Sequence, residues 1–147
     1  MKLVFELKEA LKNDPARIEA TRALTLNEAR PSMGVRGRFG LFASQQWWDN
    51  IQNGSMPRRL VSGVISRAYV SGQNATVNNT IDMVTPEGAV RGEGIYVNDR
   101  ADIALFQVGH RVEMLYALDE MKHQAAADGG ANYAKVALEV VVSLAPA

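Results

Sequence analysis

The sequence predicts an α+β protein in which N-terminal helices pack on a five-stranded antiparallel β-barrel of the SH3-like or OB-like kind. Two observations predict this fold. Before about residue 58, apolar residues recur with helical spacing between capping residues, whereas after it they alternate with polar residues. The turns between the alternating segments are short, so neighbouring strands must run antiparallel. Closing five strands into a barrel leaves no unpaired sheet edge.

Helical spacing dominates residues 1–57. The first segment carries one apolar stripe, Val4, Leu7 and Leu11, with a strand over residues 3–5 as the alternative. Asp14 followed by Pro15 has the form of an N-cap and a first helical residue, so a second helix is expected to run to about Ala23. Thr25 and Glu28 have the spacing of a capping box for a further turn.

A third helix is expected from Gln45 to Gln52. Ser44 is a good N-cap, because its hydroxyl can accept a hydrogen bond from the first helical turn, and Gly54 suits the position after a helix end. Glycine recurs at every third position over residues 34–40, which indicates a loop or an extended segment before this helix.

Alternation with a period of two predicts the strands of the barrel. Their expected ranges are 60–70, 76–83, 89–98, 112–118 and 136–144. Residues 86–88 form a hairpin turn between the second and third strands, and residues 122–131 form a loop before the last strand. The residues of the last two strands expected to face the interior are Val112, Met114, Tyr116, Leu118, Val136, Leu138, Val140, Val142 and Leu144.

The chain is expected to form a single domain over residues 1–147, with a mainly helical part over 1–57 and the barrel over 58–147. Its 16 Lys and Arg balance 16 Asp and Glu, but residues 1–60 carry ten basic and six acidic residues, and residues 61–147 six and ten. Cysteine is absent, which excludes disulfides and Cys-ligated metals. Glu6 and Glu9 interrupt any signal peptide, and no apolar run reaches membrane length, so we expect a cytoplasmic protein with no membrane association.

The candidate binding residues lie between residues 30 and 59, where arginines flank four closely spaced aromatic residues. Adjacent positions on a helix differ in direction by about 100°, so one tryptophan is expected in the core with Ile51 and the other at a pocket or a partner. Trp48, in the middle of its helix, is predicted to be a buried ring whose removal destabilises the fold. The predicted ligand- or partner-binding residues are Trp47, Trp48, Phe39, Phe42, Arg38 and Arg58.

No catalytic residue, metal ligand or cofactor is predicted. Glu120 and His123 have the spacing of a carboxylate-bridged metal motif, but such sites use that motif in duplicate and this chain holds one copy. Asp119 and Glu120 are adjacent on a strand, so they point to opposite faces and cannot act on one substrate. The glycine-rich residues 34–40 lack the lysine of a phosphate-binding loop.

The tryptophan helix carries a resemblance to other proteins. The run from Ser44 to Pro57 contains Trp-Trp-x-x-Ile-x-x-Gly-x-x-Pro, and it is followed by Gly63-Val-Ile65 and by Val108-Gly-x-x-Val112. Over about residues 44–120 the chain resembles a group of uncharacterised bacterial proteins in which this segment precedes a small β-barrel. Some of those proteins look like products of mobile gene cassettes. The resemblance implies the fold and no particular activity.

These observations favour a non-catalytic binding or interaction module that self-associates, or captures a partner or a small apolar ligand, near Trp47 and Trp48. A homodimer or larger assembly is expected, because one short helix and a glycine-rich segment cannot easily bury four aromatic rings. The alternative is a barrel that binds nucleic acid through the arginines and aromatic residues of 30–59, where guanidinium groups neutralise phosphates and rings stack on bases. An enzyme of unknown type ranks third.

The predicted last strand generates a first test. Its five inward aliphatic side chains each contribute roughly 1.5–3 kcal/mol when buried, which together exceeds the ordinary net stability of a domain. Truncation after Asp128 is therefore expected to give unfolded or insoluble protein. A soluble truncated chain with a cooperative thermal transition, followed by circular dichroism, would contradict a central role for this strand.

Overall fold

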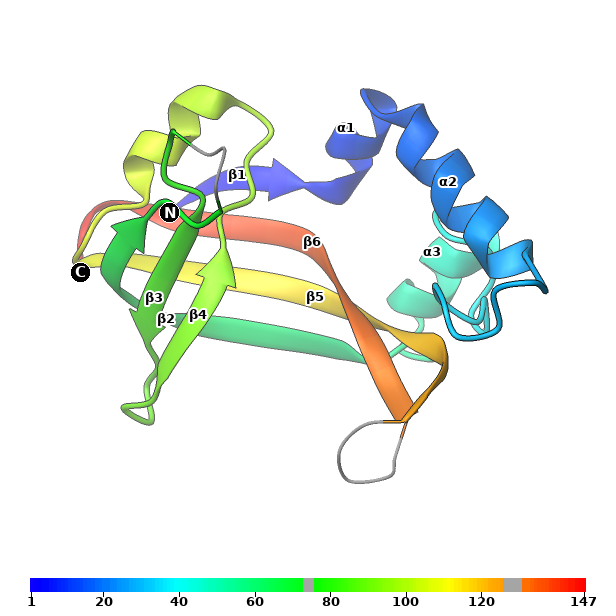
Figure 1. The fold of residues 1–147 in the computed structure, drawn as a ribbon. Coiled ribbons are helices and arrows are strands. Elements are labelled where there is room, and N and C mark those ends of the chain that lie inside the picture. The colour runs from blue at the N-terminus through cyan, green and yellow to red at the C-terminus, as the bar shows by residue number, and fades with distance from the viewer. Residues whose placement is uncertain (73–75, 126–130) are drawn as a thin grey trace. The chain divides into compact units, whose positions relative to one another are not determined.

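The computed structural model describes residues 1–72, 76–125 and 131–147 (Figure 1). The α-helices lie in the first 52 residues, and every strand but β1 follows them, together with one 3-10 helix. In chain order the elements are β1 (Lys2–Glu6), α1 (Leu7–Lys12), α2 (Pro15–Leu26), α3 (Gln45–Gln52), β2 (Arg58–Tyr69), β3 (Thr80–Val84), β4 (Val90–Gly94), the 3-10 helix η1 (Arg100–Leu105), β5 (His110–Ala125) and β6 (Ala131–Pro146).

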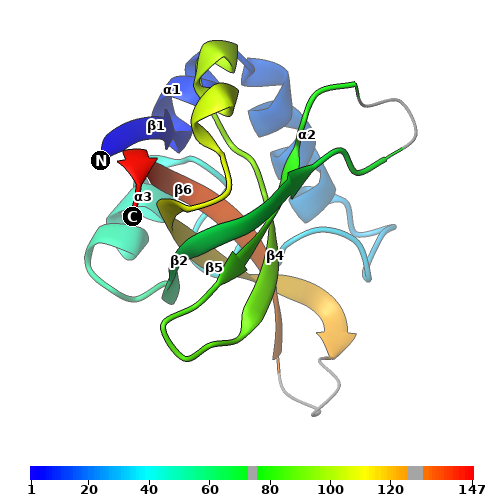
Figure 2. The ribbon, with the colours of Figure 1, turned by 90° about the vertical axis from the view of Figure 1, so that its left-hand side faces the viewer.

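The strands form one six-stranded antiparallel sheet with the order β1-β6-β5-β2-β3-β4. The α+β class and the antiparallel pairing are therefore confirmed. The strand count and the closure were predicted wrongly, because β1 and β4 each have a single neighbour and the sheet of the described residues is open (Figure 2). The hairpin of β3 and β4 does form, and its turn is closed by a 2.8 Å hydrogen bond from Thr85 N–H to Ala89 C=O.

The additional strand is β1, which the sequence analysis gave only as the alternative to a helix; it pairs with β6 from Lys2 opposite Val142 to Glu6 opposite Glu139. The register shifts between Leu3 and Phe5, so the neighbours Val4 and Phe5 are both buried. A bulge of this kind breaks the alternation expected of a strand. The helix expected over residues 1–12 forms only from Leu7 onward, where α1 begins.

The helix boundaries follow their capping residues. Asp14 accepts a hydrogen bond from Arg17 N–H with Pro15 next in the chain, and Ser44 accepts one from Trp47 N–H at the start of α3. Gly54 has a positive φ of 83°, as expected after a helix end. The capping box at residues 25–28 was wrong, because Thr25 lies inside α2 and donates its hydroxyl to the carbonyl of Thr21.

Strand β5 departs from the predicted alternation at one point. Val112, Met114 and Tyr116 are fully buried as expected, but Ala117 is buried as well. After this slip Asp119, and not Leu118, points into the core. The predicted loop over 122–131 starts too early, since β5 continues to Ala125; residues 126–130 lie outside the described residues.

Strand β6 follows the prediction in its middle and departs from it at both ends. Leu138, Val140 and Val142 are buried, whereas Leu144 is 65% exposed. Val136 is half-buried, and its neighbour Ala137 is buried.

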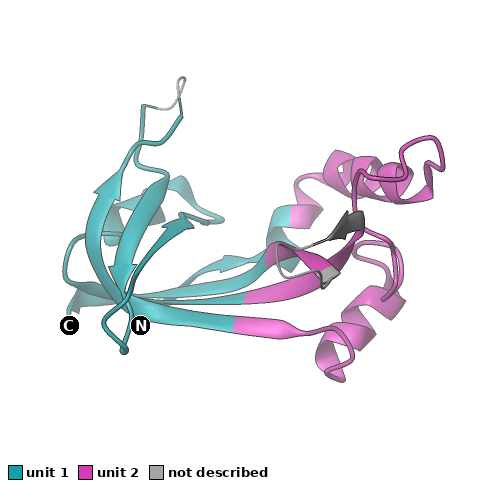
Figure 3. Cartoon of the chain, turned by 60° about the horizontal axis from the view of Figure 1, so that its bottom comes forward, with its two compact units in different colours: residues 1–10, 60–115, 137–147 teal, residues 11–59, 116–136 magenta. Residues whose placement is uncertain are grey.

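The chain divides into two compact units, shown in Figure 3. Unit 1 comprises residues 1–10, 60–115 and 137–147, and unit 2 comprises residues 11–59 and 116–136. Each unit has its own buried residues. In unit 1 they include Phe5, Ile65, Ile81, Met83, Phe106, Val112, Met114, Val140 and Val142; in unit 2 they include Leu11, Val35, Phe39, Phe42, Trp47, Ile51, Met56 and Tyr116.

Two strand glycines of unit 1 provide a matched test of packing. A Cβ at Gly63 would lie 2.5 Å from the carbonyl oxygen of Val84, whereas a Cβ at Gly92 would lie 3.6 Å from Asp82 Oδ1. Gly63→Ala is expected to lower the free energy of unfolding by about 1–3 kcal/mol, because the backbone of β3 must move. Gly92→Ala should change it by no more than about 0.5 kcal/mol. Urea unfolding of both variants checks the contrast, and equal effects would contradict it.

Candidate functional site

Three of the six predicted binding residues form the aromatic core of unit 2. Trp47 is fully buried, and Phe42 and Phe39 are 3% and 8% exposed. The Trp47 ring makes edge contacts with Phe42 at 5.0 Å and with Trp48 at 4.8 Å between ring centroids. Trp48 is half-buried. The sequence therefore located the aromatic cluster, but the buried tryptophan is Trp47, not Trp48.

Trp47 is held by a buried carboxylate that the sequence analysis dismissed. Its Nε1–H donates a 3.0 Å hydrogen bond to Oδ2 of Asp119, which is 1% exposed. The other carboxylate oxygen, Oδ1, is buried without a hydrogen-bond partner among the described residues. Burial raises the pKa of Asp119 above its ordinary value of 3.8, and the hydrogen bond from Trp47 opposes this shift. The sequence holds no local signal for this placement, because the slip of alternation before Asp119 appears only in the burial of Tyr116 and Ala117.

The predicted arginines lie on the surface of unit 2. Arg38 donates from Nη1 to Glu120 Oε2 at 3.1 Å and stacks over the Phe39 ring at 5.5 Å, and Arg36 lies 3.7 Å from the same carboxylate. Backbone bonds fix this segment on β5, because Arg36 N–H donates to the carbonyl of Glu120. Arg58 is exposed at the start of β2, where the preceding carbonyl accepts from the N–H of Leu118. The arginines thus approach β5 from two chain segments.

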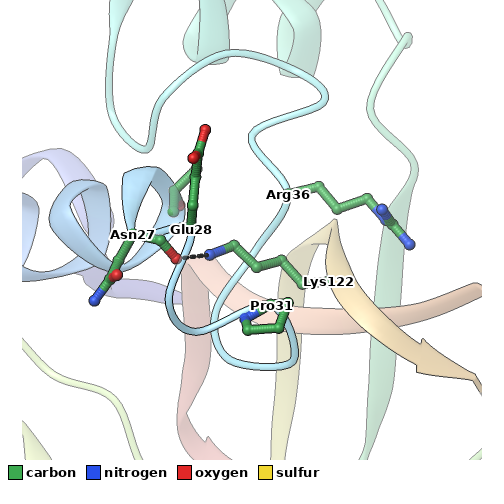
Figure 4. Close-up of a pocket in the computed structure, with 6 residues that line it drawn as sticks. Asn27, Glu28, Pro31, Arg36 and Lys122 are labelled. Carbon is green, nitrogen blue, oxygen red and sulfur yellow. Dashed lines mark hydrogen bonds between the residues drawn. The ribbon is translucent and has the colours of Figure 1, made fainter.

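Lys122 is a second buried polar residue on β5 among the residues of unit 2 whose side chains are described. It is 8% exposed, and its ammonium group donates to three backbone carbonyls, that of Leu24 in the last turn of α2 at 2.6 Å and those of Asn27 and Arg30 after the helix, both at 3.3 Å. A cation at a helix C-terminus satisfies carbonyls that have no helical partner. A cavity of about 310 Å³ lies beside it, lined by Thr25, Asn27, Glu28, Pro31, Arg36 and Lys122 (Figure 4).

This geometry changes the interpretation of the cluster. Neither tryptophan lines the cavity beside Lys122, whose residues are largely polar, so it is not the apolar ligand pocket that was expected. Base stacking needs exposed ring faces, whereas Phe39, Phe42 and Trp47 are buried within the chain. The same burial removes the argument for a homodimer, because no second copy is needed to cover these three rings.

Unit 1 carries an exposed apolar row that the sequence analysis did not single out. Val64 of β2 pairs with Val84 of β3, which pairs with Val90 of β4, so all three share one face of the sheet. They are 39%, 38% and 67% exposed, while Ile65 and Met83, on the other face, are buried. Large apolar surface that remains exposed often marks a contact site. This row of valines could be recognised only once the pairing register of β2, β3 and β4 was known.

The comparisons assign the chain to a family. Residues 1–143 match the family of immunity protein RhsI2. The chain belongs to this family. No curated protein matches it. An immunity protein binds a partner toxin, so the prediction of a binding module with a partner is confirmed at that level, while self-association and an apolar ligand gain no support. The match supports a bacterial family and does not bear on mobile gene cassettes.

The described residues contain neither a membrane-spanning helix nor a group of side chains suited to bind a metal ion. Over residues 1–72, 76–125 and 131–147, no helix is long and apolar enough to cross a membrane. In the same described residues, no three histidine or carboxylate side chains are grouped so that they could hold a metal ion. His123, which the sequence analysis considered as a ligand, has a side chain outside the described set.

The raised pKa of Asp119 predicts how stability depends on pH. The folded protein holds this proton more tightly than the unfolded chain, so the free energy of unfolding falls as pH rises from the ordinary value of 3.8 through the raised pKa. Asp119→Asn stays neutral and can still accept the Trp47 hydrogen bond. It should therefore be more stable than the natural chain at neutral pH, with a smaller difference at about pH 3. Urea unfolding across this range checks it, with exposed Glu139→Gln as control; parallel profiles would contradict it.

Proposed function

We propose that this chain protects bacteria from a protein toxin by binding that toxin, without catalysing a reaction. The observation that carries the proposal is the match of residues 1–143 to an immunity protein family. The structure supports it with compact units that have buried cores, and with surface groups suited to protein contact. Interfaces between proteins are enriched in arginine and aromatic side chains at their centres.

Of the six predicted binding residues, three suit direct contact with the toxin. Trp48 is half-buried, Arg38 is exposed beside Glu120, and Arg58 is exposed without an ion pair among the described residues. Phe39, Phe42 and Trp47 have a supporting role, because their packing fixes α3 and the segment before it. Unit 2 holds ten Lys and Arg against seven Asp and Glu, so its net positive charge favours an acidic patch on the toxin.

The function is tested by growth of bacteria that produce the active partner toxin. Production of this chain in the same cells is expected to restore growth, because binding blocks the toxin. The purified chain and toxin should form a stable complex in size-exclusion chromatography. Unrestored growth together with separate elution of the two proteins would overturn the proposed function.

The contact residues are tested separately on the purified pair. Trp48→Ala is expected to weaken toxin binding by about tenfold or more, since a central aromatic at an interface costs roughly 2 kcal/mol when truncated. Arg58→Ala should lower the association rate constant severalfold at low salt, because charges at the rim of an interface steer the two proteins together. Arg100→Ala, an exposed arginine of unit 1, is the control with the same charge change. Thermal unfolding measured alongside separates lost contact from lost folding.

A further inference from the structure

Strand β4 presents unpaired backbone groups at a sheet edge. The register places Val84 opposite Val90, Asp82 opposite Gly92 and Thr80 opposite Gly94. The hydrogen bonds at both ends of the hairpin, Thr85 N–H to Ala89 C=O and Ile95 N–H to Asn79 C=O, involve odd-numbered residues. Because bonded and non-bonded pairs alternate along an antiparallel ladder, the N–H and C=O groups of residues 90, 92 and 94 point away from β3.

Strand β4 has only part of the protection that is usual at a sheet edge. Natural edges are protected by proline or lysine, by shortness, by bulges or by inward-pointing charges. β4 is short and carries the inward-pointing Glu93, but it has neither proline nor lysine, and glycine stands at positions 92 and 94. Its two charged residues, Arg91 and Glu93, lie on the face shared with Met83 and Ile81, and Glu93 is 4% exposed. Gly94 is half-buried beside the Tyr96 ring, while Val90 is 67% exposed and Gly92 is exposed.

The side chains next to this edge specify what could be added to it. A further strand would extend the row of Val64, Val84 and Val90, and its residue beside Val90 would rest on apolar surface. Two positions along, Gly92 has no side chain, which leaves Asp82 accessible across it. Asp82 Oδ1 already accepts a 3.0 Å hydrogen bond from the Tyr69 hydroxyl. A basic side chain at that position of the added strand fits this carboxylate.

We propose that the edge of β4 at Val90 and Gly92 takes up an extended segment of the toxin as a seventh strand, with an apolar residue beside Val90 and a basic residue facing Asp82. This inference rests on the proposed function, and it names the contact in unit 1. Strand addition supplies main-chain hydrogen bonds for affinity and alternate side chains for specificity. The charge of unit 1, six Lys and Arg against nine Asp and Glu, suits a basic segment.

Amide hydrogen exchange by NMR on the purified chain with and without the toxin tests the edge directly. The amides of Val90 and Gly92 should exchange fast in the free protein and slowly in the complex. The amides of Arg91 and Glu93, which face β3, should be slow in both. Unchanged exchange at residues 90 and 92 in a formed complex would overturn the inference.

Two substitutions at Gly92 provide a second test of the edge site. Proline is tolerated on edge strands where its missing N–H would face solvent, so Gly92→Pro should fold and bind the toxin about tenfold or more weakly, as expected for loss of an intermolecular hydrogen bond and of close strand approach. Gly92→Ala keeps the N–H, so it should bind more tightly than Gly92→Pro, and any loss relative to the natural chain measures how far its methyl group, about 3.6 Å from Asp82 Oδ1, obstructs the basic residue. Thermal unfolding of both variants verifies their folding.

The outcomes separate the two proposals. If the natural chain does not bind the toxin, the proposed function fails and the edge site with it. If the natural chain and Gly92→Pro bind equally well, and the exchange at residues 90 and 92 is unchanged, only the edge site is overturned.

Discussion

Unit 2 depends on three polar residues near the end of β5, each of which holds a different part of the N-terminal half. Asp119 binds the indole of Trp47, Glu120 pairs with the arginines at 36 and 38, and Lys122 caps the carbonyls at and after the end of α2. An unpaired charge in a protein interior is costly, so the burial of each group is tolerated only while its partner segment is in place. The helices and the loop before α3 are thereby positioned by polar contacts on one strand, and the aromatic cluster fills the space between them.

The parts of the fold that were predictable are those that local chemistry decides. The N-caps at Asp14 and Ser44 and the turn after β3 require only neighbouring residues, and all three are where the sequence placed them. The bulge in β1, which was only an alternative in the sequence, and the slip at Tyr116 and Ala117 were not predictable in this way. Both are irregularities in pairing, and the energy that favours them comes from distant partners such as β6.

The error over the tryptophans follows from the same slip. On a regular strand Leu118 would face inward and Asp119 outward, which leaves Trp47 with no polar partner for its N–H. With Asp119 inside, the buried position suits the tryptophan whose Nε1–H reaches that carboxylate. A single change of phase on one strand therefore decides which aromatic residue is core and which remains accessible, and helix periodicity alone cannot reveal it.

An open sheet also gives this immunity protein a possibility that a closed barrel lacks. A closed barrel has no edge, whereas here β4 ends the sheet, and the backbone groups of residues 90, 92 and 94 point away from β3. Main-chain hydrogen bonds do not distinguish one sequence from another, so discrimination between toxins has to come from the side chains beside the edge. The valine row favours an apolar residue on the added strand, and the carboxylate of Asp82 across Gly92 favours a basic residue two positions along. A segment with only one of these two residues would leave either the apolar surface exposed or the carboxylate without a partner. This difference in binding free energy is the physical basis for specificity at such a site.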